Sequence, residues 1–483
     1  MQDLPDLTTL SHAQKDELIV ALWQQVQVLT AQVQQMQAHI LHLQGRLSLN
    51  SRNSSKPPSS DGLAKPAPKS LRAKGQRPVG GQRGHEGNTL SQSAQLDHTI
   101  VHQGPTHCSS CQGELTQHQI VDRRQVFELP VLRAQVIEHQ LLRSTCSCGA
   151  VHQGSFPPDI NAPAQYGPRV KALLVHLNQH HLVPLQRSCA LMHDVFGLGI
   201  SQASALAFCQ QAAKALQPTV AAIGQAVQSA PVVHADETGI RVQGKLAWLH
   251  CAVTSSLTWL GTHAKRAGEA FEALGILGGV RGTLVHDGLA AYKGLECTHS
   301  LCNAHHLREL RFIHEQTNER IWDSWAQEMF DLLVQGSREV QAAGGPLPLP
   351  RQAWFAQQWD RLLERAQRHH PYVAPHGAPR GKQGRHKQSK AHNLLRRLRQ
   401  YRDDVWRFMT DAGVPFTNNL AEQALRMSKV RQKISGCFRT QEGAETFFTI
   451  RSYLATMHKQ SACLFECLVS TFKGQPVQPC LAV

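Results

Sequence analysis

The sequence lacks any apolar run that approaches the roughly 18 residues needed to cross a bilayer, which excludes a membrane-spanning protein. Its acidic N-terminus has neither the basic nor the apolar region of a secretory signal, so we expect no signal peptide. Cysteine is sparse: 13 residues, an odd number, are spread over 483 positions. This pattern favours reduced thiols and is compatible with a metal site.

Acidic residues are few in relation to basic ones. The chain has 35 Asp and Glu against 50 Lys and Arg, a formal net charge of +15, which makes nucleic acid the simplest partner. Hydrophobic residues make up 41% of the chain, enough to form buried cores, so a wholly disordered protein is excluded. The length predicts two to four structural units.

Residues 14–50 have the pattern of a coiled coil. Apolar residues alternate at intervals of three and four: Ile19, Leu22, Val26, Leu29, Val33, Met36, Ile40, Leu43 and Leu47. β-Branched residues predominate at one repeating position and leucine at the other, which favours a parallel two-stranded coil. The alternative is one amphipathic helix that packs on its own protein. A helix that only packs on its own protein does not need nine apolar positions in register, so dimerisation is the better interpretation.

Residues 51–100 read as a basic linker. Between residues 51 and 85 there are eight Lys or Arg and one acid, with many Pro, Ser and Gly. Such a segment cannot bury a core and should be flexible. It is either a site of non-specific attraction to phosphates or a merely soluble tether.

Residues 101–155 carry two short cysteine pairs: Cys108, Cys111, Cys146 and Cys148. Four thiolates at such spacing predict a closed tetrahedral Zn²⁺ site of a structural kind. Gly113 and Gly149 follow the pairs, where a knuckle turn needs a residue that tolerates positive φ. Because the second pair is one residue tighter than usual, His107 or His152 could replace one thiolate. The alternative is four unrelated buried cysteines.

Residues 164–228 are predicted to be helical. One helix runs from Pro184 through Phe196, and Ser201 caps a second that extends to about Leu216. Two helices joined by a Gly-containing turn have the outline of a helix-turn-helix. The second helix has only one basic residue, so ordinary helical packing is favoured over phosphate contacts.

Residues 229–460 are predicted to form a mixed α/β core with a helical insertion. Three β-rich segments precede a helix and one further strand: 230–242, 245–255, 257–264, 268–277 and 282–288. The chain is then helical and rich in Trp from about 317 to 408, with a basic interruption at 375–390. Helices follow from Asn419, and 461–483 are expected to be a C-terminal tail. The fold class is therefore multidomain α+β.

Three carboxylates are candidates for chemistry. Asp236 lies near the end of the first strand, and Asp287 ends the strand at 283–286. Carboxylates at the ends of neighbouring strands converge, and such a cluster suits Mg²⁺, which prefers oxygen ligands. A third acid, Glu422, lies on a predicted helix in one row with three cations: Arg426, Lys429 and Lys433.

Each of these carboxylates also has a simpler interpretation. Asn419-x-x-Glu422 has the spacing of a capping box, and Glu422 with Arg426 has the spacing of an ordinary ion pair. Asp236 could be a turn residue, and Glu237 beside it is a rival ligand.

Four segments carry a family resemblance: HADETGIRV (234–242), VHDGLAAY (285–292), CNAHHLREL (302–310) and NNLAEQALRMSKVRQKISGCFRT (418–440). They resemble the characteristic blocks of bacterial insertion sequence 66 family transposases. The resemblance extends in the family's order from the zipper-like N-terminus through LNSRNSSKPPSSDG and GGQRGHEG to the four-cysteine segment. Several ordered blocks are more specific than any single motif.

The resemblance implies a DDE transposase with a ribonuclease H-like core, interrupted by a helical insertion at about 317–408. By motif match, Asp236, Asp287 and Glu422 would be the three catalytic acids, holding two Mg²⁺ ions for phosphodiester cleavage and strand transfer. Cys302 and His305 match a short Cys/His signature that follows the second acid in several DDE families. We interpret this pair as structural and leave metal support open.

The implied partner is double-stranded DNA at the terminal inverted repeats of the element, contacted by the basic helix: Arg426, Lys429, Arg431 and Lys433. A homodimer or higher oligomer, small accessory proteins of the same element and a bacterial cytoplasmic, nucleoid-associated location are expected with it. Residues 361–440 hold 18 Lys or Arg against 5 Asp or Glu, so positive charge gathers beside the proposed third acid. The alternatives are a non-catalytic DNA-binding or assembly protein and a stand-alone metal-dependent nuclease.

Overall fold

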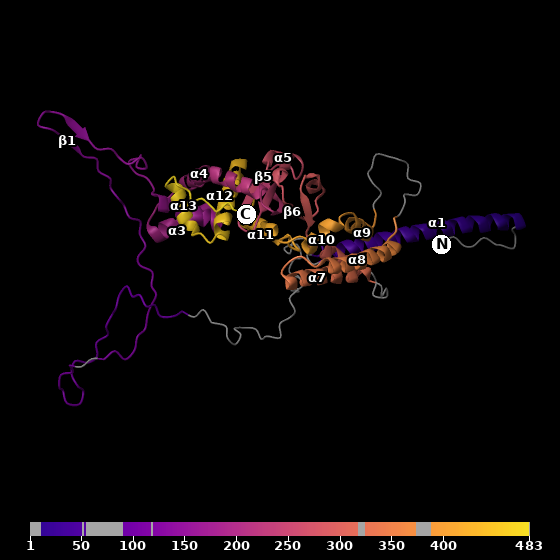
Figure 1. Cartoon of the computed structure of the whole chain (residues 1–483), viewed down its shortest axis with the longest axis horizontal. Coiled ribbons are helices and arrows are strands. Elements are labelled where there is room, and N and C mark those ends of the chain that lie inside the picture. The colour runs from indigo at the N-terminus through magenta and orange to yellow at the C-terminus, as the bar shows by residue number, and fades with distance from the viewer. Residues whose placement is uncertain are drawn as a thin grey trace. The chain divides into compact units, whose positions relative to one another are not determined.

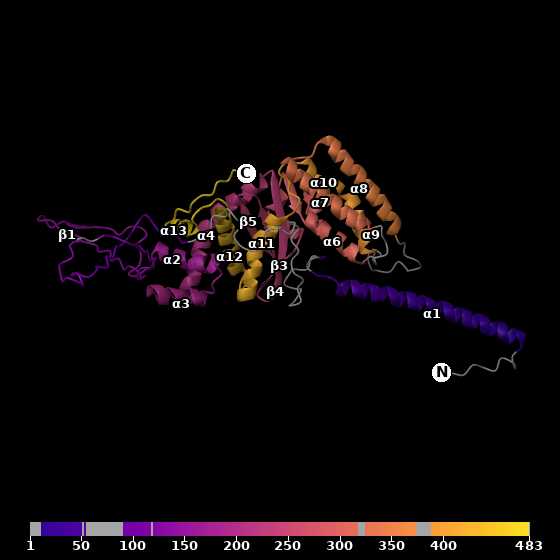
Figure 2. The same cartoon turned by 90° about the horizontal axis from the view of Figure 1, so that it is seen from below.

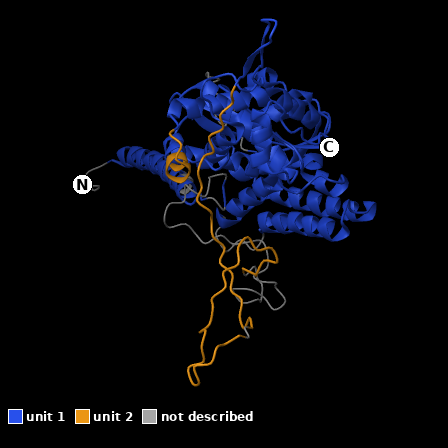
Figure 3. Ribbon diagram, turned by 90° about the vertical axis from the view of Figure 1, so that its left-hand side faces the viewer, with its two compact units in different colours: residues 1–65, 141–190, 200–483 blue, residues 66–140, 191–199 orange. Residues whose placement is uncertain are grey.

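The computed structural model describes residues 11–50, 53–54, 90–116, 119–316, 324–372 and 388–482. The chain separates into two compact units, which Figure 3 draws in different colours. The larger unit comprises residues 1–65, 141–190 and 200–483, and the smaller comprises 66–140 and 191–199. Most of the expected basic linker and most of the basic interruption at 375–390 lie outside the described residues.

The N-terminal segment forms one continuous helix, α1 (His12–Leu47), as predicted. It begins at a capping box, in which the Ser11 hydroxyl accepts the Gln14 N–H and the Gln14 side chain accepts the Ser11 N–H. All nine apolar positions of the predicted coil are exposed, from 41% at Leu43 to 86% at Leu47. The apolar stripe is therefore not covered by the part of its own chain that the structure describes.

The end of α1 is attached to helix α6 (Asn303–Gln316). Asn53 is 2% exposed, and its side-chain amide donates to the Glu315 carboxylate at 2.8 Å. The Gln316 amide donates to the Ser48 hydroxyl at 3.1 Å, and Leu49 packs against the core to which α6 contributes. The asparagine-rich segment after the coil thus fixes α1 to the helical part of the larger unit.

A five-stranded mixed sheet forms the centre of the larger unit. Its strands are β3 (Val232–Val242), β4 (Lys245–Val253), β5 (Thr258–His263), β6 (Thr283–His286) and β7 (Thr298–Leu301). The strand order is β5-β4-β3-β6-β7, with β3, β4 and β5 antiparallel and β3, β6 and β7 parallel. The four predicted strands are present, whereas β7 was not predicted, because THSL has only one strongly apolar residue.

Helices cover both faces of this sheet. They include α4 (Gln202–Gln228), α5 (Glu269–Leu274), α11 (Asn419–Ser435) and α12 (Gln441–Lys459). Figure 2 shows α11 lying along β3 and β4, where Ala421 and Leu425 join the buried core. The Ser201 cap is confirmed, because its hydroxyl accepts the Ser204 N–H. The prediction that this helix ends near Leu216 is wrong: α4 continues past Pro218 to Gln228, because Val220, Ile223 and Val227 extend its buried face, which outweighs the backbone hydrogen bond that proline cannot make.

Five helices form a separate bundle between β7 and α11 (Figure 1). They are α6, α7 (Trp325–Ala343), α8 (Leu349–His369), α9 (Lys390–Gln400) and α10 (Arg402–Thr410). Their shared core includes Trp325, Trp359 and Trp406, and the rings of Trp359 and Trp406 are in edge-to-face contact at 5.4 Å. The helical insertion expected from about 317 begins earlier, at Asn303, because α6 contributes to the same core.

The remaining elements lie within the predicted zinc segment, follow it in sequence or close the chain. They are the hairpin β1 (Arg143–Thr145) and β2 (Val151–Gln153), α2 (Pro168–Val175), the π-helix η2 (His176–His180), α3 (Leu185–Phe196) and α13 (Leu464–Phe472). The expected tail, 461–483, is partly folded, since Leu464, Leu468 and Val469 of α13 are buried. Within the described residues, no helix is long and apolar enough to span a membrane.

Candidate catalytic site

Asp236 and Asp287 lie at the same edge of the sheet. The parallel strands β3 and β6 pair His234 with Val285, so each aspartate follows its paired residue by two positions. Asp236 is the fifth residue of β3, which continues to Val242, so the expectation that it lies near the end of the strand is wrong, whereas Asp287 directly follows β6. Because β3 and β6 run in parallel, their register places the two side chains side by side. The convergence predicted from the sequence follows directly from this register.

Each aspartate is oriented by its own backbone. Asp236 Oδ1 accepts the Glu237 N–H at 2.8 Å, and Asp287 Oδ1 accepts the Leu289 N–H at 2.9 Å. Gly288, between Asp287 and Leu289, has a φ of +91°, which glycine adopts at little energetic cost. In each carboxylate one oxygen is held, and the second oxygen is available for a ligand.

Glu422 is brought to the same edge by Asn418. This residue precedes α11, is 1% exposed, and donates its amide to the Ala235 carbonyl at 2.8 Å. Its Oδ1 lies 2.9 Å from Nδ1 of His234, and its backbone N–H donates to the Cys302 sulfur at 3.2 Å. Asn418 therefore joins α11, β3 and the start of α6 beside the aspartates.

The simpler interpretations of Glu422 do not hold in the structure. The N-cap of α11 is Asn418 rather than Asn419, and no side chain makes a capping hydrogen bond there. Glu422 thus lies one position past the capping-box position. Within the described part of the chain, Glu422 and Arg426 form no ion pair. The Glu422 carboxylate is exposed in the first turn of α11 and free to serve a ligand.

The electrostatics also connect the three acids. Burial, followed by the charges of Glu237 and Asp287, raises the pKa of the Asp236 carboxyl to about 8, and Glu422 adds to the rise. Like charges raise one another's pKa only when they are near, so the three carboxylates lie in one region of the larger unit. Three carboxylates with free oxygens are the type of donor that a hard divalent ion such as Mg²⁺ prefers. Within the described residues their oxygens do not all lie within 4.8 Å of one another, so the structure brings the three acids to one region without closing them into a single ligand group.

Glu237, the rival ligand, is turned to the opposite face of β3, since successive side chains alternate. It is 8% exposed and fully engaged there: the Tyr292 hydroxyl donates to Oε2 at 2.7 Å, and Arg266 donates twice to Oε1 at 3.0 and 2.8 Å. Burial raises the pKa of Glu237. A carboxylate with these partners supports the sheet and is not available to a metal.

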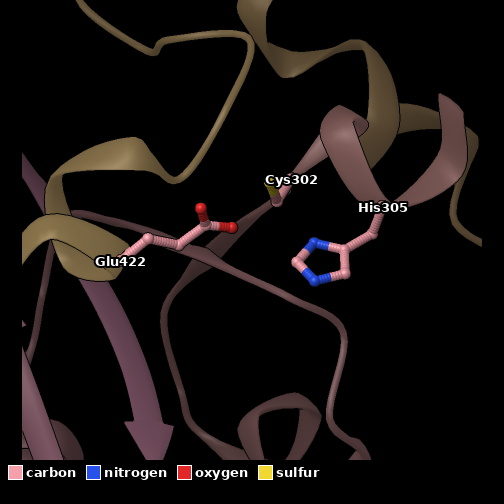
Figure 4. A group of neighbouring side chains, drawn as sticks. All are labelled: Cys302, His305 and Glu422. Atoms are coloured by element: carbon pink, nitrogen blue, oxygen red, sulfur yellow. The ribbon is translucent and has the colours of Figure 1, made fainter. Parts of the chain in front are cut away.

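Cys302 and His305 lie beside Glu422 (Figure 4). Cys302 follows β7, and His305 is in the first turn of α6. One ligand atom from each of Cys302, His305 and Glu422 lies within 4.8 Å of the others. Burial lowers the pKa of His305 to about 4, and the nearby Arg308 adds to the fall. Sequence reasoning singled out this pair but did not place it at the acids.

The comparisons with known proteins identify the family. A protein-family model described as "Transposase IS66 family" matches residues 163–446, more than half of the chain. The chain belongs to the IS66 transposase family. A second model, "zinc-finger binding domain of transposase IS66", matches residues 105–149, and a family of unknown function matches 2–91. No curated protein matches the chain.

In this IS66 transposase, the zinc-finger match supports a structural zinc in the segment of the four cysteines. In the first pair, backbone N–H groups of Cys111 and Ser110 lower the pKa of Cys108. In the second pair, the Cys148 N–H lowers the pKa of Cys146. Turns that favour the thiolate suit zinc, which binds the thiolate.

The geometry of the two cysteine turns matches the prediction in part. Gly149 has φ of +87°, as expected for a residue that follows the second pair. In the first turn the residue with positive φ is Gln112, at 59°, rather than Gly113. His107 lies in a bridge with Glu114, and His152 lies in β2 opposite Ser144.

The basic row of the IS66 transposase divides into two groups. Arg426, Lys429 and Lys433 are exposed, although the Lys429 ammonium donates to the Gly239 carbonyl at 2.8 Å. Arg431 instead stacks over the rings of Phe438 and Phe447, at 3.9 and 4.7 Å. Burial lowers the pKa of Arg431 to about 10. Arg431 lies nine residues from Glu422, half a turn out of phase, and so on the other side of the helix.

Sequence reasoning missed Asn418 as a residue that positions Glu422, although an Asn doublet before a helix marks the position. Its partners Ala235, His234 and Cys302 lie on elements distant in sequence, so they cannot be predicted from local periodicity.

Proposed function

We propose that this IS66 transposase cleaves DNA at the ends of its own insertion sequence and joins those ends to new DNA, with Mg²⁺ as the metal. The observation that carries the proposal is the convergence of Asp236, Asp287 and Glu422, two from neighbouring parallel strands and one from α11. Paired aspartates with a helical third acid are suited to binding two divalent ions at a phosphodiester.

The sheet supports a ribonuclease H-like core for this reaction. Three antiparallel strands followed by two parallel ones, in the order β5-β4-β3-β6-β7, place the two aspartates on the central strand and its parallel neighbour. The bundle α6–α10 between β7 and α11 is consistent with an insertion ahead of the third acid. Such a fold would bring acids that are far apart in sequence to one region of the protein.

When bound, two Mg²⁺ ions would activate a water or a 3′-hydroxyl for in-line attack and stabilise the leaving oxygen. Asp236, Asp287 and Glu422 would hold them through the oxygens that no backbone N–H occupies. Arg426 and Lys433 would bind phosphates next to the acids, with Lys429 if it releases Gly239. We leave Arg431 out of this set because of its stacking on two Phe rings.

We also propose that Cys108, Cys111, Cys146 and Cys148 bind the structural zinc, and that α1 pairs with the same helix of a second copy. The exposed apolar stripe of α1 supports the second proposal, since exposed apolar surface of this extent is normally covered by a partner. Accessory proteins of the element and a nucleoid location would follow from this role.

The test uses the purified full-length chain, Mg²⁺, and DNA that carries the terminal inverted repeats found beside its gene. We expect nicked and joined products, and a loss of about a thousandfold in Asp236→Asn, equivalent to about 4 kcal/mol in the barrier. Asp194→Asn, at an exposed carboxylate, is the matched control.

Three outcomes separate the alternatives. Equal activity in Asp236→Asn and the parent would overturn the assignment of this acid. Cut products without joined ones would favour a stand-alone nuclease. Salt-sensitive DNA binding with no strand breakage in the presence of Mg²⁺ would favour a non-catalytic assembly protein.

A further inference from the structure

The Cys302-x2-His305 pair has no role in the reaction described above. Both residues lie where β7 passes into α6, and the His305 N–H donates to the Cys302 carbonyl at 3.2 Å. This turn places the side chains of Cys302 and His305 close to the carboxylate of Glu422 on α11. Figure 4 shows the nitrogen-bearing edge of the His305 ring turned toward the Glu422 carboxylate.

Two observations point to a cation as the ligand of these residues. His305 Nδ1 is buried and has no hydrogen-bond partner within the described residues, which is unfavourable for a polar atom unless something binds it. Within the described part of the chain, Cys302, His305 and Glu422 are also the one group of three possible ligands whose atoms all lie within 4.8 Å of one another. An unpartnered buried nitrogen inside such a group is expected of residues that bind a cation.

The donor types select the cation. A thiolate, an imidazole and a carboxylate form an N, S and O set, which favours Zn²⁺ and related transition ions over Mg²⁺. Zn–S and Zn–N bonds of about 2.3 and 2.1 Å place tetrahedral ligand atoms about 3.3–3.7 Å apart. A small inward rotation of the three side chains from their present separation therefore completes the coordination, with the fourth position open.

Neighbouring groups support such a site. The Asn418 N–H donates to the Cys302 sulfur at 3.2 Å, the kind of contact that orients and stabilises a metal-bound thiolate. The same Asn418 anchors the first turn of α11, and hence Glu422, to β3 through the Ala235 carbonyl. The two helix starts that carry the ligands are thus fixed to each other before any ion binds.

We infer that Cys302, His305 and Glu422 bind one transition-metal ion of the Zn²⁺ class, separate from the zinc of the four-cysteine segment. Its consequence rests on the proposed function: because Glu422 is also the proposed third acid, this ion competes with Mg²⁺ for the same carboxylate. Zinc at this position would hold the transposase inactive, and its removal would release Glu422.

The experiment counts bound metal in the full-length chain after zinc loading and dialysis. We expect two zinc ions per chain in the parent, one in Cys302→Ser and one in the double variant Cys108→Ser/Cys111→Ser. Cys209→Ser is the matched control: it also changes a buried thiol that accepts a side-chain hydrogen bond, and should retain two ions. Retention of the second ion by Cys302→Ser, or one ion only in the parent, would overturn the inference.

A spectroscopic measurement covers the case in which Cys302→Ser fails to fold. In the Cys108→Ser/Cys111→Ser background, Co²⁺ should give a charge-transfer band from a single thiolate. His305→Gln and Glu422→Gln should retain this band but weaken Co²⁺ binding at least tenfold. Unchanged affinity in both variants would contradict the ligand set.

The activity measurement separates this inference from the proposed function. Added zinc should inhibit Mg²⁺-dependent cleavage in the parent, a chelator should reverse the inhibition, and Cys302→Ser should need at least tenfold more zinc. If no variant cleaves DNA, the proposed function fails while the metal count still stands. If cleavage occurs but zinc acts equally on parent and Cys302→Ser, the inference fails alone.

Discussion

Asn418 shows how one buried side chain positions Glu422, the proposed third acid. Its amide contacts Ala235 and His234 of β3, and its backbone contacts Cys302, so three elements meet at a residue that is 1% exposed. A buried amide with all these partners has one favourable orientation, because any other leaves polar atoms unpaired. The first turn of α11, with Glu422, takes its position from this orientation.

We predict that Asn418→Ala lowers the free energy of unfolding by about 1–3 kcal/mol, since it leaves the Ala235 carbonyl and His234 unpaired. It should also abolish the stabilisation by Mg²⁺, because Glu422 is no longer held beside the aspartates. Chemical denaturation with and without Mg²⁺ measures both effects. The adjacent, exposed Asn419 is the control, and Asn419→Ala should change stability by less than about 0.5 kcal/mol. Equal effects of the two variants would contradict this role.

The pKa of Asp236 predicts how the free energy of unfolding depends on pH. Burial and the nearby charges of Glu237 and Asp287 raise its pKa to about 8, far above the usual value for an aspartate, so the folded state binds a proton that the unfolded state has released at neutral pH. The stabilisation associated with that proton is lost as the pH rises toward about 8. Unfolding free energy should therefore fall by about 1–3 kcal/mol between pH 5 and pH 7.5.

Asp236→Asn should remove most of this fall and make the metal-free protein more stable at pH 7.5 by about 1–3 kcal/mol, at the cost of activity. Urea unfolding in the presence of a chelator, at several pH values, measures the slope. Asp194→Asn, at an exposed site, should keep the slope of the parent. Identical slopes in Asp236→Asn and the parent would show that this carboxyl is ionised in the metal-free fold.

At the scale of the element, α1 is a helix whose stability depends on what covers it. An isolated helix with nine exposed apolar positions is only marginally stable in water, because its backbone hydrogen bonds alone contribute little to its stability. Burial of this stripe against the same helix of a second copy would stabilise it. The attachment of its end to α6 through Asn53 and Glu315 would carry that pairing to the helical bundle.

We predict that Leu29→Glu, within the apolar stripe, reduces the average mass in sedimentation toward that of the monomer. Gln27→Glu adds the same charge at an exposed position on the other side of α1 and should leave the mass unchanged. A parent protein that already sediments as a monomer, or a Leu29→Glu variant with unchanged mass, would refute pairing through this helix.

At the scale of the whole molecule, the charge is concentrated rather than spread. Residues 51–85 and 361–440 hold most of the excess of Lys and Arg, and the second of these ranges contains the acid-bearing helix α11. A cationic surface beside a carboxylate cluster attracts phosphates to the acids and releases counterions when DNA binds.

We predict that Arg426→Ala and Arg431→Ala differ, although both remove one guanidinium from the same helix. Arg426→Ala should reduce the slope of log affinity against log salt by about one. Arg431→Ala should leave that slope unchanged and lower the unfolding free energy by about 1–2 kcal/mol, because its cation–π contacts are internal. DNA-binding titrations at several salt concentrations measure this slope for each variant. An equal loss of slope in both variants would contradict the assignment of Arg426, but not Arg431, to phosphate contacts.

Much of the secondary structure of this protein could be predicted from its sequence, because the signals are local. The nine-position repeat predicted α1, the Ser201 cap predicted the start of α4, and apolar β-rich runs predicted β3 to β6. The start of α6 and the strand β7 were missed, since NAHHLREL and THSL are polar and lack a clear period. Their structure comes from packing on the bundle and on β6.

The sequence by itself determined the family, four strands of the central sheet and the three acids as candidates, because each depends on residue type and on short spacing. Only the tertiary structure decided which carboxylates meet. It turns Glu237 to the opposite face of β3, where Tyr292 and Arg266 bind it, and it brings Glu422 together with Cys302 and His305. These contacts join residues far apart in the chain, and the packing of α11 and α6 against the sheet, rather than any local pattern, creates them.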